Sequence, residues 1–172
     1  MQREPELDGE PTAVGPIFRW AGSKRKLLPR LIPYWLGGHT RYFEPFAGSA
    51  ALFFALAPER ALLSDVNREL IDALTAIRDE PDAVFDTASA YITGKAHYYR
   101  LRNVDSRCLD TIGRAARFVY LNRYCFNGIY RTNGAGKFNV PFAPTGTGGL
   151  PDRTRFRSAA RLLGRAGGWP HV

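Results

Sequence analysis

The sequence predicts an α/β protein whose parallel, doubly wound sheet is followed by a helical insertion. Two short apolar stretches, 41–46 and 61–64, are each followed by a helical stretch, and this alternation is typical of a parallel sheet. From 82 to 123 the apolar pattern is helical throughout, which indicates the insertion. Only two strands are identifiable along the sequence, so the predicted sheet is incomplete.

The composition is that of a folded protein with a basic surface. With 172 residues, 45% of them hydrophobic, the chain can form one domain with a core, or one domain plus a small insertion. The 24 Lys and Arg residues exceed the 16 Asp and Glu residues, and the net charge of +8 favours a polyanionic partner.

Neither the cysteines nor the apolar segments point to secretion or to a membrane. Cys108 and Cys125 are too far apart in sequence for a CxxC redox or zinc pair. Residues 1–16 lack the apolar core of a signal peptide, and the longest apolar run, 50–57, is too short to span a bilayer. We therefore expect a cytoplasmic protein without membrane association.

The first regular element is predicted to be a short amphipathic helix over 24–36. Its apolar side chains recur at helical spacing, Ser23 can act as the N-cap, and Gly37-Gly38 can end the helix. Residues 1–16 are rich in acids, Gly and Pro, so we expect a flexible arm before this helix.

The first strand and its helix are predicted over 41–57. Residues 41–46 are aromatic-rich and form the strand, and Gly48-Ser49 forms a tight turn. The turn opens an apolar helix over 50–57, which ends at Pro58.

The second strand and helix repeat this arrangement. The strand covers 61–64 and leads into Asp65, and Asn67 can cap the helix that follows. One face of this helix is apolar, and its members are Leu70, Ile71, Leu74 and Ile77.

The rest of the chain is predicted to be helical except for one long loop. Residues 124–151 contain several Gly and Asn turn signals and many aromatics, so they are predicted to form a loop. A final basic helix is predicted over 153–165.

The segment 18–24 combines features of a ligand site. Trp20 offers a flat apolar face, and Lys24 offers a cation at a helix start for a ligand carboxylate. A core tryptophan beside an exposed lysine is the alternative that spacing alone leaves open.

The Gly turn after the first strand lies where doubly wound folds bind a nucleoside cofactor. The turn at 44–49 is not GxGxxG, and the sequence contains no GxxxxGK[ST] loop, so a cofactor without a pyrophosphate fits better than NAD or ATP. Asp65 follows the turn by about 20 residues, where an acid can accept hydrogen bonds from both ribose hydroxyls. A helix cap is the alternative for Asp65.

The stretch 120–131, closing with 136–142, interleaves aromatics, amides and arginines. Arg suits guanine or phosphate, Asn suits adenine edges, and apolar groups can fill the space left by an extruded base. The stretch therefore indicates nucleic-acid recognition, with a polar loop over an aromatic core as the alternative.

Four collinear segments resemble the Dam-type adenine-N6 DNA methyltransferases. They are RWAGSK at 19–24, FEPFAGSAALF at 43–53, LSDVN at 63–67, and YLNRYCFNGIYR with GKFNVPF at 120–142. The similarity covers roughly residues 17–143. It implies a Rossmann-like S-adenosylmethionine-dependent methyltransferase fold, here with an incomplete doubly wound sheet, and a helical target-recognition insertion.

The resemblance implies which residues bind S-adenosylmethionine and duplex DNA. Trp20, Lys24 and Asp65 carry over as cofactor ligands, and the turn wraps the methionine end of the cofactor. The turn residues are Glu44, Pro45, Phe46, Ala47, Gly48 and Ser49. The expected DNA-binding residues are Arg19, Arg123, Asn127, Ile129, Arg131, Asn133 and Lys137.

Four segments follow from the resemblance. Residues 1–16 are the arm, 17–80 the first part of the cofactor-binding α/β domain, and 81–151 the DNA target-recognition insertion with its hairpin loop. Residues 152–172 are the start of the return to the α/β domain.

The sequence departs from the family after the recognition segment. The family continues into further strands and a [DNS]PP[YFW] motif, whose acceptors polarise the poorly nucleophilic adenine N6 and whose aromatic stacks on the flipped base. This chain contains no Pro-Pro dipeptide, so no catalytic residue is assigned. We expect a truncation or frame disruption near 164–167, and little or no turnover by this chain.

Two alternatives stay open for such a chain. One is a non-catalytic DNA-binding fragment, and the other is a split enzyme whose second polypeptide supplies the missing part. A metal site is not expected, because His39, His97 and His171 are isolated and no Cys/His spacing fits a metal.

Overall fold

The structure is a computed structural model that describes residues 14–35, 38–143 and 149–166. Most of the predicted arm, the Gly37 part of the first helix stop, and the tail 167–172 lie outside the described residues. None of the helices in the described ranges is long and apolar enough to cross a membrane.

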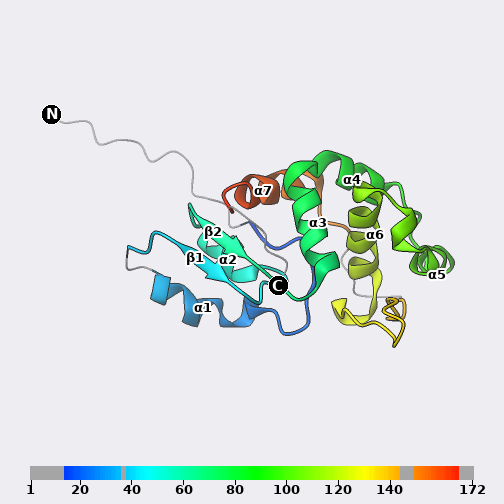
Figure 1. Ribbon diagram of the computed structural model, residues 1–172, viewed down its shortest axis with the longest axis horizontal. Coiled ribbons are helices and arrows are strands. Elements are labelled where there is room, and N and C mark those ends of the chain that lie inside the picture. The colour runs from blue at the N-terminus through cyan, green and yellow to red at the C-terminus, as the bar shows by residue number, and fades with distance from the viewer. Residues whose placement is uncertain (1–13, 36–37, 144–148, 167–172) are drawn as a thin grey trace.

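The α/β part is a small parallel sheet with one helix in its crossover (Figure 1). Strands β1 (Tyr42–Glu44) and β2 (Ala61–Leu63) pair in parallel with Phe43 opposite Leu62. The helix between them is α2 (Ala51–Leu56). Ala166 forms one further parallel bridge to Ala61, beyond the two strands. The predicted alternation of strand and helix is confirmed.

The predicted helix over 24–36 is wrong in its regularity. The chain there forms a 3-10 turn η1 (Lys24–Leu27), one α-helical turn α1 (Leu28–Leu31) and a second 3-10 turn η2 (Ile32–Trp35). Pro29 and Pro33 lack the backbone N–H that a continuous helix needs. The N-cap is confirmed, since Ser23 Oγ accepts a hydrogen bond from Arg25 N at 3.4 Å.

Helix α3 (Arg68–Asp79) is formed as the sequence predicts. Asn67 Oδ1 accepts a hydrogen bond from Leu70 N at 3.0 Å and caps the helix. The four residues of the predicted apolar face are all fully buried.

The remaining helices also follow the sequence closely. The helical stretch after α3 consists of α4 (Pro81–Ser89), α5 (Lys95–Asn103), η3 (Ser106–Cys108) and α6 (Thr111–Tyr124). After the short turn η4 (Phe126–Gly128) and the long loop, α7 (Arg153–Leu163) is the predicted basic helix. Asp110 and Asp152 cap α6 and α7, each accepting from a backbone N–H at 2.7 Å.

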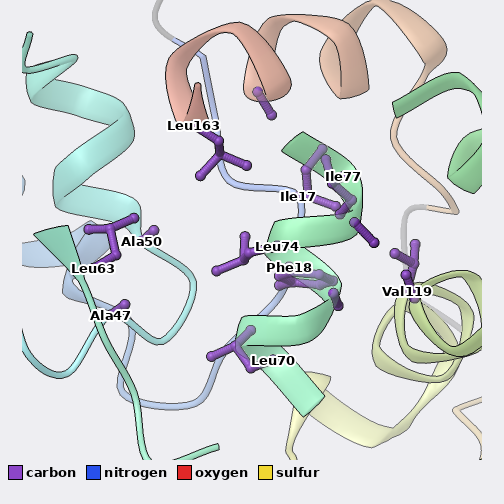
Figure 2. Packing of buried hydrophobic residues seen from close by; sticks show 14 of the residues in the cluster. Ile17, Phe18, Ala47, Ala50, Leu63, Leu70, Leu74, Ile77, Val119 and Leu163 are labelled. Atoms are coloured by element: carbon purple, nitrogen blue, oxygen red, sulfur yellow. The ribbon is translucent and has the colours of Figure 1, made fainter. Parts of the chain in front are cut away.

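One hydrophobic core joins the sheet to the helical region, with α3 in the middle. Figure 2 shows Leu70, Leu74 and Ile77 of α3 between Leu63 of β2 and Val119 of α6. In Figure 1 α3 accordingly lies between the sheet and α6, and α7 covers it from one end. The predicted insertion therefore shares its core with the α/β part, and the segment boundaries near 80 and 151 stay a prediction.

A second, smaller core lies beneath the long loop. It is rich in tyrosine, and its buried members are Tyr98, Leu101, Tyr120, Leu121, Tyr124, Cys125 and Val140. Tyr98 Oη donates a hydrogen bond to the Val140 carbonyl at 2.9 Å, so α5 is fixed directly to the loop. This core holds the recognition loop on α5 and α6.

Candidate functional site

The turn between β1 and α2 is hydrogen-bonded to Asp65, the acid that follows β2. Gly48 has φ +51°, and its N–H donates to Asp65 Oδ2 at 2.9 Å. The other carboxylate oxygen of Asp65 accepts from Asn67 N at 2.9 Å. Parallel strands end at the same edge of a sheet, so the turn and the acid meet although they are far apart in sequence.

Asp65 is not the cap of α3, because Asn67 fills that role. Each oxygen of Asp65 accepts one backbone hydrogen bond, and a carboxylate has about four acceptor sites. The acid therefore keeps acceptor capacity for a ligand hydroxyl beside the turn.

Lys24 is paired with a buried carboxylate of β1. Its Nζ lies 3.0 Å from Glu44 Oε1 and donates to the Phe46 carbonyl at 2.7 Å. Tyr42 Oη donates to the other oxygen, Glu44 Oε2, at 2.8 Å. Burial and the Glu44 charge raise the pKa of Tyr42 far above its usual value, so Tyr42 stays a donor. The ammonium uses one N–H for the Phe46 carbonyl and pairs with Glu44 by charge, so it keeps donor capacity for a ligand.

Trp20 packs against the turn rather than standing apart from it. A Cβ at Gly48 would lie 2.8 Å from Trp20 Cδ1, so only glycine allows the indole this close. The indole also stacks on Tyr130, with ring centroids 6.0 Å apart and planes at 20°. Trp20 thus touches both the turn and the recognition loop.

The predicted cofactor residues are brought together around this turn. Ser49 Oγ lies within hydrogen-bond distance, 2.9 Å, of Ser23 Oγ, which ties the turn to the first motif. Phe46 extends into solvent with 76% of its surface exposed. Val66, 86% exposed, is a residue that the motif analysis missed, and its signal was an apolar side chain directly after the acid.

The recognition loop is a narrow hairpin. Thr132 pairs with Phe138 and Cys125 with Phe142, both antiparallel. Asn133 Oδ1 accepts from the N–H groups of Ala135 and Lys137, each at 3.0 Å. The carbonyl oxygen of the Asn133 side chain therefore shapes the hairpin tip, and its amide nitrogen has no partner among these bonds.

Four of the predicted DNA-binding residues lie exposed along this hairpin. They are Asn127, Arg131, Asn133 and Lys137, whereas Ile129 is half-buried. Asn127 adopts a left-handed conformation with φ +54°. Arg131 Nε donates to Asn139 Oδ1 at 2.7 Å, which orients its guanidinium.

Arg19 and Arg123 lie side by side where the first motif meets α6. Arg19 N donates to Asn122 Oδ1 at 2.8 Å, and Asn122 Nδ2 donates to the Arg19 carbonyl at 2.7 Å. Arg123 Nε donates to the Gly149 carbonyl at 2.7 Å, and burial together with the neighbouring arginines lowers the pKa of Arg123. Arg123 is thus partly occupied in holding the loop.

Two residues of this region were missed by sequence reasoning. Asn122 is buried and clamps the Arg19 backbone, a role that nothing in the local sequence indicates. Phe126 is 51% exposed at the start of the hairpin, and its signal was an aromatic directly before an Asn-Gly turn.

A polar cavity of about 490 Å³ opens beside the hairpin tip. Its walls come from the start of α3, the end of α5, η3, α6 and the hairpin. Its charged lining residues are Glu69, Arg102, Asp105, Arg107, Arg117 and Lys137. Four of these side chains are cationic and two are acidic, and one of the acids, Asp105, already pairs with Arg107 at 2.6 Å.

No group of three or more His, Cys, Asp or Glu side chains that could hold a metal ion occurs among the residues that the structure describes. The expectation of no metal site stays a prediction.

The model of one protein family matches residues 20–148, and its description is D12 class N6 adenine-specific DNA methyltransferase. The chain is 34% identical over 154 residues to the type II methyltransferase M1.LlaDCHI of Lactococcus lactis subsp. cremoris, covering 86% of this chain and 54% of the relative.

Other relatives give the same family. The type II methyltransferase M.CviBI of Paramecium bursaria Chlorella virus NC1A is 37% identical over 74% of this chain and 49% of its own length. The DNA adenine methylase of Salmonella typhi is 35% identical over 73% of this chain and 46% of its own length. The chain spans about half the length of these relatives.

Proposed function

The chain belongs to the D12 class of N6 adenine-specific DNA methyltransferases, and we propose that it binds S-adenosylmethionine at the β1–α2 turn and duplex DNA at the recognition hairpin. The observation that carries the proposal is the convergence of Trp20, Gly48 and Asp65 from three separate motifs. We propose that the sheet is the first part of a Rossmann-like methyltransferase fold, and that the protein acts in the cytoplasm.

The chemistry of the turn fits S-adenosylmethionine. The turn at Gly48 has no room for a Cβ beside Trp20, so its backbone is bare on that side. Asp65 has acceptor sites left for ribose hydroxyls. The exposed side chains of Phe46 and Val66 offer apolar surface for the adenine. When bound, the cofactor supplies an electrophilic methyl group.

Lys24 is assigned a role on the methionine end of the cofactor. Its remaining N–H can reach a carboxylate, while Glu44 and the Phe46 carbonyl hold the ammonium in place. Because Glu44 already neutralises part of the Lys24 charge, we propose that Lys24 orients the cofactor more than it attracts it.

The exposed side of the hairpin is assigned to DNA. Arg131, oriented by Asn139, suits a base edge or a phosphate, and Phe126 is placed to fill the space left by a flipped base. The basic cavity beside the tip suits a backbone phosphate. The net charge of +8 supports association with this polyanion.

Methyl transfer to adenine N6 is the activity proposed for the complete catalytic unit. The 172 residues contain no Pro-Pro dipeptide, so the acceptors that polarise N6 are not assigned in this chain. We propose that the chain alone binds cofactor and DNA with little or no turnover. A non-catalytic DNA-binding role and a split enzyme completed by a second polypeptide both agree with such behaviour.

Cofactor binding is tested by titrating the full chain with S-adenosylhomocysteine in a calorimeter. We expect binding by the wild type, and at least about tenfold weaker binding by Asp65→Asn, which replaces a charged acceptor. Asp72→Asn, on the exposed side of α3, is the matched control and leaves the affinity unchanged. Equal affinities in Asp65→Asn and the wild type would exclude the assigned site.

DNA binding and turnover are tested with labelled duplexes. Fluorescence anisotropy measures affinity as salt is raised, and we expect Arg131→Ala to weaken binding while Arg161→Ala, on α7, changes it little. Tritiated S-adenosylmethionine then reports methylation. Robust label incorporation by the chain alone contradicts the proposed lack of turnover, and absence of DNA binding at low salt contradicts the DNA-binding role.

A further inference from the structure

The cofactor turn and the recognition hairpin are connected by a closed ring of contacts. From the turn, Gly48 N donates to Asp65, and Asp65 in turn accepts from Asn67 at the start of α3. In the first turn of α3, Glu69 Oε2 accepts a hydrogen bond from Tyr130 Oη at 3.1 Å. We name this set the turn–hairpin ring, and its members are Trp20, Gly48, Asp65, Asn67, Glu69 and Tyr130.

Tyr130 closes this ring from the hairpin side. The phenol side chain of Tyr130 stacks on Trp20, whose indole edge lies against Gly48. Burial and the Glu69 carboxylate raise the pKa of Tyr130 far above its usual value, so its hydroxyl stays a donor to Glu69. Phe118 and Phe138 pack on the Tyr130 phenol, with ring centroids 5.7 Å and 5.6 Å away, and fix its position.

The position of Tyr130 decides where its neighbours point. Ile129 has an extended backbone and Thr132 pairs with Phe138 across the hairpin, and successive side chains of such a chain alternate in direction. With Tyr130 held inward, Arg131 is turned out to solvent, where it is exposed. A shift of Tyr130 would therefore move the residue assigned to DNA.

A second contact links the same two regions. A Cβ at Gly128 would lie 2.4 Å from Arg19 Cβ, so the hairpin backbone presses on the residue directly before Trp20. Asn122 holds the Arg19 backbone from the other side. The segment carrying Trp20 is thus wedged between the hairpin and the cofactor turn.

We propose that Tyr130 is a positioning residue that couples the two binding sites, so that S-adenosylmethionine and DNA bind cooperatively. The inference rests on the proposed function. A cofactor on the turn contacts Trp20 and Asp65, two members of the turn–hairpin ring, and it restricts the movement of Trp20. Trp20 then holds Tyr130, and with it the DNA-binding arrangement of the hairpin. Such coupling is reciprocal by thermodynamic necessity.

The test measures a coupling factor with the full chain. The affinity for a fluorescein-labelled duplex with a randomised centre is measured with and without saturating S-adenosylhomocysteine. The affinity for S-adenosylhomocysteine is measured with and without the duplex. We expect each ligand to tighten the other by about fivefold or more, by the same factor in both directions.

Variants of Tyr130 separate coupling from a merely structural role. Tyr130→Ala, which loses both the stack and the hydrogen bond, is expected to bring the factor close to unity while each ligand still binds alone. Tyr130→Phe keeps the ring and loses the bond to Glu69, so it lowers the factor by a smaller amount. Tyr34→Ala removes a tyrosine that is 81% exposed and leaves the factor unchanged.

The outcomes are distinguishable. A wild type that binds neither ligand contradicts the proposed function itself. A wild type that binds both ligands independently, or a folded Tyr130→Ala that keeps the full factor, overturns the coupling alone. If Tyr130→Ala does not fold, Tyr130→Phe decides, and an unchanged factor in that variant overturns the proposal.

Discussion

At the scale of residues, contacts with neighbouring side chains determine which residue type fits at several positions of the site. Gly48 combines a left-handed backbone with an indole ring packed where a Cβ would stand. Glu44 is buried, and it forms an ion pair with the Lys24 ammonium through Oε1 and accepts a hydrogen bond from the Tyr42 phenol through Oε2. In each case the residue type follows from a neighbour that is distant in sequence.

Gly48→Ala is predicted to impair both stability and cofactor binding. The left-handed conformation costs an alanine about 1–2 kcal/mol, and the new Cβ, 2.8 Å from Trp20 Cδ1, displaces the indole. Urea denaturation and calorimetry with S-adenosylhomocysteine measure the two effects. Gly134→Ala is the control, because its Cβ meets nothing within 4 Å. Equal stability of both variants would contradict the packing of Trp20 on the turn.

The two thiols are predicted to differ sharply in reactivity. Cys108 is exposed, whereas burial raises the pKa of Cys125 to about 11. At pH 8 only about a thousandth of the Cys125 population is then thiolate, the reactive form. Labelling with Ellman's reagent should show one fast and one very slow thiol, and Cys108→Ser should remove the fast phase. Two fast phases would show that Cys125 is accessible.

At the scale of elements, the starts of the longest helices follow local chemistry, whereas both ends of α2 are strained. The three longest helices of the described residues, α3, α6 and α7, begin at Asn or Asp caps, namely Asn67, Asp110 and Asp152. Helix α2 is instead flanked by Ala50 and Ala57, both in the left-handed conformation. A non-glycine residue there carries strain, which makes α2 the least favourably terminated helix of the sheet region.

Ala57→Gly is predicted to stabilise the protein by up to about 1 kcal/mol. Glycine removes the left-handed strain at the helix end, and part of this gain is offset by the flexibility of glycine in the unfolded chain. Ala55→Gly, inside α2, is the matched control and should destabilise by about 1 kcal/mol. Urea midpoints measure both changes, and destabilisation by both variants would mean that Ala57 is not strained.

At the scale of the whole molecule, one core joins the predicted segments 17–80, 81–151 and 152–172. It contains Ile17 directly before the first motif, Leu63 of β2, Val119 of α6 and Phe156 of α7. A core shared in this way makes the stability of the sheet depend on the helices that follow it in sequence. The protein is therefore expected to behave as one cooperative unit.

A single unfolding transition is the corresponding prediction. Trp20 and Trp35 report on the sheet region by fluorescence, in a Trp169→Phe background, while far-UV circular dichroism reports chiefly on the helices. We expect coincident urea midpoints. Phe156→Ala is expected to lower the free energy of unfolding by about 3–5 kcal/mol and to shift both midpoints together. Separate midpoints would indicate two independent folding units.

The sequence by itself determined the local elements and the motifs. The apolar face of α3, the Ser23 and Asn67 caps, and the strand–turn–helix order depend on residues within a few positions of one another, so they can be predicted from neighbours. The four motifs were likewise readable, and the family that they suggested is the family to which the chain belongs.

Only the tertiary structure decided how these parts meet. The pairing of Lys24 with Glu44, the stack of Trp20 on Tyr130 and the clamp of Asn122 on Arg19 join residues 20 to 110 positions apart, and no local pattern encodes them. The regular helix expected over 24–36 failed for the opposite reason, because its two prolines outweighed its apolar periodicity. Local interactions choose the element, whereas packing across the chain chooses its partners.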